Sequence, residues 1–269
     1  MLRGRIVHAF GLVGLAVTMA VGAVAVGPLP AEAAAKKVVV VVGPVGSNTS
    51  YFKSVANDAA AQAKKYGANV VKIYTPYATW SRVKKAAQGA HVLIYAGHGN
   101  GWPSPYKPFQ RFTKDGLGLN PYSGSGNRKV KYWGEKYLAE ELNLAQNAVV
   151  ILMRLCYASG NSEPGKADPT KSTAMARVDN YGAGFLRTNA KVVFAQGYGK
   201  SNHIFYSLFK TSRTMKQIFW ADPSATRTYA ISFASSRTSG MKAIMDPYRR
   251  GKYYRSVIGK LAMTAGDWR

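Results

Sequence analysis

A single cysteine, Cys156, is the only thiol available for covalent chemistry in this chain of 269 residues. A cysteine attacks a carbonyl carbon as the thiolate, and a neighbouring imidazole that accepts its proton supplies that form at neutral pH. Of the four histidines, His98 is followed by Gly99, whose backbone N–H can approach a reacting oxygen closely. Cys156, His98 and Gly99 therefore provide a nucleophile, a base and a hydrogen-bond donor for an oxyanion.

Both reactive side chains come directly after apolar segments of strand length. Residues 91–96 (HVLIYA) precede Gly97 and His98, and residues 148–155 (AVVILMRL) precede Cys156. Continuous apolar runs are typical of strands that are covered on both faces. Ligands bind beyond the carboxyl ends of the strands in parallel sheets. If the two strands are neighbours, we expect His98 and Cys156 to meet at that edge of the sheet.

Strand and helix patterns alternate along the chain from residue 37. Apolar runs at 37–42, 69–74 and 191–195 predict three further strands, and a weaker run near 254–258 predicts another. Helical periodicity predicts helices at 52–66, 79–89, 133–146, 179–189 and 204–220. This alternation predicts an α/β fold, with a mainly parallel sheet of about five to six strands and helices on both faces. Residues 36–269 are expected to form one domain, with a long loop at 100–131 and a less defined part from about residue 223.

The segments VLIYAGHG (92–99) and VVILMRLC (149–156) together resemble the caspase-like cysteine peptidases, which include legumain, gingipain, clostripain and separase. The order of histidine before cysteine, with 58 residues from one to the other, fits that family, and the resemblance extends from residue 37 to about residue 200. It implies a caspase-like fold and a cysteine endopeptidase that acts on protein or peptide substrates. By this resemblance His98 is the general base, Cys156 is the nucleophile, and the N–H groups of Gly99 and Cys156 form the oxyanion hole.

The residue that would select the substrate side chain is left open. Outside the first 35 residues, the chain has 11 of its 12 acidic residues, because only Glu32 lies in that segment. Four of them lie near the predicted site and are candidates for a carboxylate that selects arginine or lysine: Asp115, Glu163, Asp168 and Asp179. For Asp168 and Asp179 a turn or helix-cap role is the alternative, since aspartate favours both positions.

The amino-terminal segment has the layout of a secretory signal peptide. Arg3 and Arg5 precede an apolar stretch at residues 6–27, and the small residues AEAAA follow at 31–35. We therefore expect residues 1–35 to be cleaved and the protein to be secreted or extracytoplasmic. Uncleaved, the segment would serve as a membrane anchor, because 22 apolar residues can span a bilayer. Cleavage removes two of the 37 basic and one of the 12 acidic residues, which changes the net charge from +25 to +24.

Composition excludes several classes of protein. A hydrophobic share of 47% with 12% aromatic residues is globular and excludes wholesale disorder. One cysteine excludes an intramolecular disulfide and any site with several thiolates, and the histidines do not form the spaced pair of a zinc peptidase. No cofactor is expected, and the resemblance leaves a dependence on calcium open. The strong positive charge favours anionic envelope polymers or an anionic lipid surface as partners, with nucleic acid less favoured.

Two alternatives stand beside the peptidase with a His98–Cys156 dyad. The first is a non-catalytic caspase-like module that binds anionic envelope polymers by charge. The second is a papain-like cell-wall endopeptidase, in which Cys156 would act with His203, 47 residues downstream. In the papain-like fold the cysteine begins a helix, whereas Cys156 is predicted to follow a strand.

Overall fold

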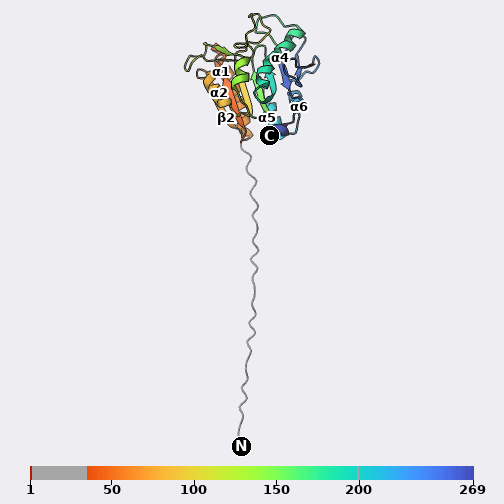
Figure 1. Ribbon diagram of the computed structural model, residues 1–269. Coiled ribbons are helices and arrows are strands. Elements are labelled where there is room, and N and C mark those ends of the chain that lie inside the picture. The colour runs from red at the N-terminus through yellow and green to blue at the C-terminus, as the bar shows by residue number, and fades with distance from the viewer. Residues whose placement is uncertain (2–34, 199) are drawn as a thin grey trace. The chain divides into compact units, whose positions relative to one another are not determined.

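The computed structural model describes residue 1, residues 35–198 and residues 200–269. The expected leader, residues 1–35, lies almost wholly outside the described residues. Within residues 35–269 a central sheet is covered by helices (Figure 1). Among the described residues, no helix combines the length and the apolar character needed to cross a membrane.

The main sheet has eight strands in the order β2-β1-β3-β6-β7-β10-β9-β8. The five parallel strands are β1 (Lys37–Val42), β2 (Asn69–Tyr74), β3 (Val92–Ala96), β6 (Ala148–Met153) and β7 (Ala190–Gln196). Antiparallel pairing then adds β10 (Arg255–Gly259), β9 (Lys242–Met245) and β8 (Ile231–Ala234). The predicted mainly parallel α/β sheet is confirmed, but the expected count of five to six strands is wrong.

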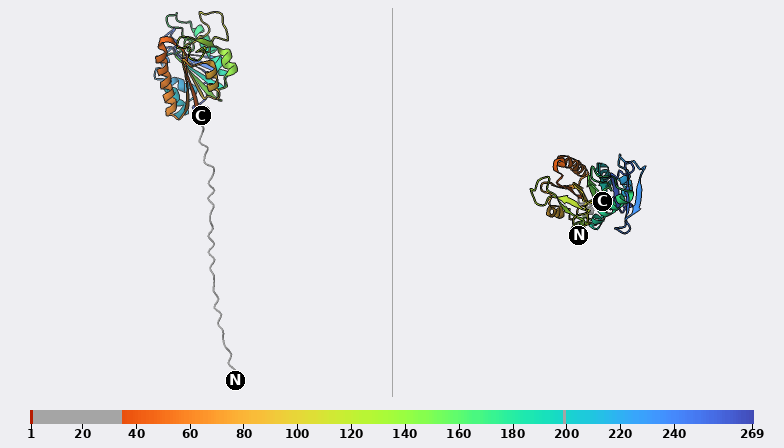
Figure 2. Two further views of the ribbon diagram at one scale, coloured as in Figure 1. Left: turned by 90° about the vertical axis from the view of Figure 1, so that its left-hand side faces the viewer. Right: turned by 90° about the horizontal axis from the view of Figure 1, so that it is seen from above.

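Helices cover both faces of the sheet, as Figure 2 shows from the side. The alternating side chains of β1 divide between two buried clusters: Val39 and Val41 face one, and Val38, Val40 and Val42 face the other. The first cluster is covered by α2 (Trp80–Ala87), α3 (Glu135–Glu141) and α4 (Lys171–Leu186), and the second by α1 (Thr49–Lys65), α5 (Asn202–Lys210), α6 (Met215–Trp220) and α7 (Ala265–Trp268). Burial on both faces is the physical reason for the continuous apolar runs.

The long segment at 100–131 contains structure that its sequence does not predict. Strand β4 (Leu117–Leu119) pairs antiparallel with β5 (Lys131–Trp133), and Leu117 and Leu119 are fully buried in the cluster beneath α4. The predicted helix at 204–220 is in fact two helices, because residues 211–214 interrupt it before Thr214 caps α6. The helix predicted at 179–189 begins earlier, at Lys171.

Candidate active site

The predicted histidine and cysteine lie at the same edge of the sheet. Strands β3 and β6 are parallel neighbours, and their last residues, Ala96 and Met153, are paired in register. His98 follows two residues after Ala96, and Cys156 three residues after Met153. Both side chains line one cavity of about 650 Å³. The two strands that precede His98 and Cys156 are therefore neighbours, which the sequence alone could not establish.

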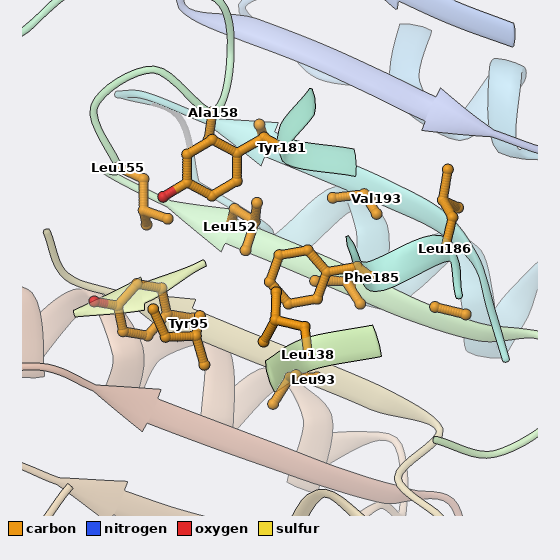
Figure 3. Close-up of a cluster of buried hydrophobic side chains, with 14 of the residues drawn as sticks. Leu93, Tyr95, Leu138, Leu152, Leu155, Ala158, Tyr181, Phe185, Leu186 and Val193 are labelled. Atoms are coloured by element: carbon orange, nitrogen blue, oxygen red, sulfur yellow. The ribbon is translucent and has the colours of Figure 1, made fainter. Parts of the chain in front are cut away.

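The backbone around His98 is held by a buried tyrosine of β3. The Tyr95 hydroxyl lies 2.7 Å from the Gly118 carbonyl and 3.0 Å from the His98 carbonyl, and it accepts from the Gly118 N–H at 2.9 Å. A Cβ on Gly97 would lie 2.3 Å from that hydroxyl, so only glycine fits there. This tyrosine joins the end of β3 to the β4–β5 hairpin and positions the loop that carries His98. Its ring belongs to the buried cluster shown in Figure 3.

The two reactive loops touch through their backbones at Gly99. A Cβ at this position would lie 2.1 Å from the Cys156 carbonyl oxygen, so a larger residue would push the loops apart. In the part of the chain that the structure describes, the N–H groups of Gly99 and Cys156 donate to no other residue, and that of Cys156 acts only on the cysteine's own sulfur. Both residues line the cavity. Two donors that no other residue of the described chain uses, beside a thiol, match the chemical requirement of an oxyanion hole.

Cys156 sits in a turn whose backbone conformation is strained. Arg154 has a φ of 61° and Tyr157 a φ of 72°, values that cost side-chain-bearing residues on the order of 1–3 kcal/mol each. The buried side chains of Leu155 and Tyr157 hold the turn on either side of the cysteine, and the Arg154 N–H donates to the Gln196 carbonyl at 2.8 Å. Figure 3 shows Leu155 among the core residues. Anchoring the two neighbours leaves the half-buried thiol facing the cavity.

Burial keeps both reactive groups neutral in the resting site. It raises the pKa of the Cys156 thiol to about 11, and the negative charge of Glu163 raises it further, whereas the cysteine's own N–H acts in the opposite direction. The His98 imidazole reaches solvent, yet the protein atoms packed around it lower its pKa, against a raising effect of Glu163. At neutral pH the pair is therefore a thiol and a neutral imidazole, so the thiolate has to form as the base removes the proton.

Glu163 is the one candidate carboxylate that lines the cavity. Its two oxygens accept hydrogen bonds from the hydroxyls of Tyr157 (2.7 Å) and Tyr106 (2.9 Å). Two cations, Lys114 and Arg154, line the same cavity. The site thus presents a carboxylate held by two tyrosines together with positive groups, rather than a uniformly acidic pocket.

The other three candidate carboxylates bind partners outside this cavity. Asp115 is fully buried, where it accepts from the Trp102 N–H at 2.9 Å, and desolvation raises its pKa to about 8. Asp168 is exposed and pairs with Lys252 at 2.6 Å. Asp179 accepts from the Ser236 N–H at 2.8 Å and holds the chain after β8. None of the three lines the cavity that contains Cys156.

His203 is not brought to Cys156. It lies in the first turn of α5, with its Nε2 3.8 Å from the Asp222 carboxylate, and burial lowers its pKa to about 4. Neither cavity that Cys156 lines includes His203. Since Cys156 also follows a strand rather than beginning a helix, the arrangement required by the papain-like alternative is absent.

Several residues of the cavity have no signal in the sequence. Tyr106 and Lys114 come from the segment between β3 and β4, and Phe52 comes from the first turn of α1. Lys114 is nearly fully buried and donates to Asn100 Oδ1 at 2.8 Å, although a lysine in a polar loop reads as an exposed residue. Arg154 lies inside the segment that ends at Cys156, and only its position two residues before the thiol indicates in the sequence that it lines the cavity.

Comparison with known proteins adds little to this geometry. No family model and no curated protein sequence matches the chain. A crystal structure of the Arg-specific cysteine proteinase gingipain R is similar at 15% identity and a TM-score of 0.36, over 86% of this chain and 61% of that chain, which is less than two thirds of its length. Protein GSU0716 from Geobacter sulfurreducens is similar at 14% identity and a TM-score of 0.31, over 69% of this chain and 87% of the other. Similarity this low indicates at most a distant relationship of fold, and it carries no conclusion about the site.

Proposed function

We propose that the chain is a secreted cysteine endopeptidase, in which Cys156 is the nucleophile and His98 the general base. The observation that carries the proposal is the placement of both side chains in one cavity, at the carboxyl ends of two neighbouring parallel strands. The free N–H groups of Gly99 and Cys156 support it, because acyl transfer needs donors for the developing oxyanion. Secretion is supported by the amino-terminal sequence pattern alone.

The proposed reaction has two stages. In the first, His98 takes the thiol proton as the Cys156 sulfur attacks the peptide carbonyl carbon, and the oxyanion faces the N–H groups of Gly99 and Cys156. The protonated His98 then gives its proton to the leaving amine, and a thioester remains on the sulfur. In the second stage a water molecule, activated by His98, attacks the thioester, and the acid product leaves while the sulfur regains its proton.

Cleavage of a mixed peptide library by the purified protein, with new termini identified by mass spectrometry, tests the proposal. Cys156→Ala is expected to abolish cleavage, and His98→Ala is expected to reduce it by about 10²–10⁴-fold. His91→Gln is the matched control: it changes the histidine just before the opposite end of β3, where Nδ1 accepts from the Lys37 N–H at 3.1 Å, and should leave cleavage intact. Cleavage that persists in Cys156→Ala, or no cleavage of any peptide, would overturn the proposal.

The second candidate is a non-catalytic module that binds anionic envelope polymers. It is favoured by the net charge of +25 and by the raised pKa of the resting thiol. If the library is not cleaved, binding of the protein to anionic polymer that weakens steeply as salt rises would support this candidate instead.

A further inference from the structure

A second large groove lies along the outer edge of the sheet, at the terminal strand β2. It has a volume of about 730 Å³ and shares no lining residue with the Cys156 cavity. Its charged lining is entirely cationic: Lys37, Lys53, Lys72, Arg82 and Lys85. None of these five forms an ion pair with another residue of the described chain. The groove is therefore a concentration of uncompensated positive charge.

The backbone along this groove has unused hydrogen-bonding groups. β2 pairs with β1 only, and the N–H groups of Asn69 and Thr75 donate to the β1 side, to the carbonyls of Lys36 (3.0 Å) and Val42 (2.8 Å). Backbone groups alternate in direction along a strand, so those of Val70, Lys72 and Tyr74 face away from the sheet. An exposed edge of this kind is a template for a further strand.

The cations flank that edge on both faces of the sheet. Lys72 donates to Asn57 of α1 at 2.8 Å and thus lies on the α1 side, where Lys53 also projects from α1. Arg82 and Lys85 belong to α2, which covers the opposite face. Successive side chains of an added strand would point alternately to these two faces, so each would meet positive charge.

We propose that the edge of β2 binds an extended, acidic polypeptide segment of another protein, which adds to the sheet as a further strand. The free backbone groups favour a peptide over a polyanion without amide groups, because only a peptide can continue the ladder. The occupant is not a second copy of this chain. Of its 12 acidic residues, Glu163 and Asp168 lie within six residues of each other but already have partners in Tyr157, Tyr106 and Lys252, and the only other cluster is at residues 135–141. That cluster forms α3.

Peptide binding to the intact protein tests the pairing directly. The probe is a fluorescent hexapeptide with four glutamates on both faces and two valines, and its control carries N-methyl groups at alternate residues, which preserve charge but block one edge of the backbone. Anisotropy should show the control binding at least tenfold more weakly. Equal affinity of the two peptides, or stronger binding of inorganic polyphosphate than of the parent peptide, would overturn strand addition in favour of a charge-only site.

A pair of variants at one position separates charge from backbone. Lys72→Gln removes a charge and keeps the outward N–H, whereas Lys72→Pro removes both and is a substitution that edge strands tolerate. The proline variant should bind the peptide severalfold more weakly than the glutamine variant, and equal binding would count against the proposal. Should the proline variant fold poorly, the comparison of methylated and parent peptides on the wild-type protein still decides. Cys156→Ala should bind as wild type does, so this test is independent of peptidase activity.

Discussion

Two histidines of this protein lie near carboxylates, but in surroundings that differ in access to solvent. His98 reaches solvent at a cavity that also contains Cys156 and Glu163. His203 is enclosed with Asp222 and Arg255, whose guanidinium lies 3.2 Å from the Asp222 carboxylate. His203, Asp222 and Arg255, the enclosed cluster, join α5 and α6 to β10. At the cavity, by contrast, the His98 imidazole is free to contact a reactant.

The difference shows why residue type alone does not identify a site. In the enclosed cluster the two terminal nitrogens of the Arg255 guanidinium are already committed, one to Asp246 at 2.6 Å and the other to the Phe219 carbonyl at 2.6 Å. Buried charges persist only when they are paired in this way. At the cavity, by contrast, the N–H groups of Gly99 and Cys156 remain available. Uncommitted groups beside an accessible space, rather than the presence of a histidine and an acid, distinguish the candidate active site.

Replacing each of the two histidines in turn should give the largest difference in activity. His98→Ala should reduce peptide cleavage by about 10²–10⁴-fold, the usual contribution of a general base, with little change in stability because the side chain is exposed. His203→Gln should leave the cleavage rate per folded molecule unchanged. Steady-state kinetics and thermal unfolding of both variants check this, and a loss of cleavage in His203→Gln at full folding would break the comparison.

Removing the central cation of the enclosed cluster should affect stability rather than chemistry. Arg255→Met leaves Asp222 and Asp246 buried without their partner, and breaking such a buried pair costs about 3–5 kcal/mol. Urea unfolding measures the loss. The exposed pair of Lys252 and Asp168 offers the control, because Lys252→Met should cost less than about 1 kcal/mol. Similar losses of unfolding free energy in Arg255→Met and Lys252→Met would contradict the difference between the buried and the exposed ion pair.

Acid should weaken the enclosed cluster through His203. Its folded-state pKa of about 4 lies below the ordinary value of 6.5, so the unfolded chain binds the proton more readily between these values. The stabilising contribution is complete above pH 6.5 and is lost as the pH falls toward 4, to a total of about 3 kcal/mol. Chemical unfolding across this range should show the loss in wild type and a smaller loss in His203→Gln. Identical curves would remove His203 as the cause.

Separating the two reactive loops should impair cleavage through geometry alone. Gly99→Ala places a methyl group 2.1 Å from the Cys156 carbonyl oxygen, so His98 and the donor N–H must move, and we expect at least a tenfold loss of kcat/KM. Gly266→Ala is the matched control, since its new methyl group comes no closer than 3.3 Å to any neighbour. Unchanged kinetics in Gly99→Ala would show that this contact does not position the site.

The smallest expected effect concerns the charge beside the thiol. Glu163 raises the pKa of Cys156, so Glu163→Gln should lower that pKa and increase the thiolate fraction at a given pH. Alkylation by iodoacetamide at pH 8 should then be severalfold faster than in wild type, whose rate should still be rising at pH 10 because the thiol titrates near pH 11. Slower alkylation in Glu163→Gln would contradict the conclusion that Glu163 raises the pKa of Cys156.

The predictable half of the fold is the parallel half. Strands β1 and β2 occupy the residues expected from their apolar runs, 37–42 and 69–74. The carboxyl half is only partly predictable: the sequence predicts β10 near 254–258 but not β8 and β9, because strands of four residues have too little periodicity of their own. The hairpin of β4 and β5 is not predictable for the same reason, because each of its strands has only three residues.

The sequence by itself determined the order of the main-sheet strands and their helices up to β7, and it named the thiol, the histidine and the glycine, because local runs of apolar residues and glycine turns are properties of neighbouring residues. Only the tertiary structure decided that β3 and β6 are adjacent, that Glu163 rather than Asp115, Asp168 or Asp179 reaches the cavity, and that His203 belongs to a different cluster. Strand pairing and burial depend on contacts between residues far apart in the chain, and the pattern of any single segment does not contain them.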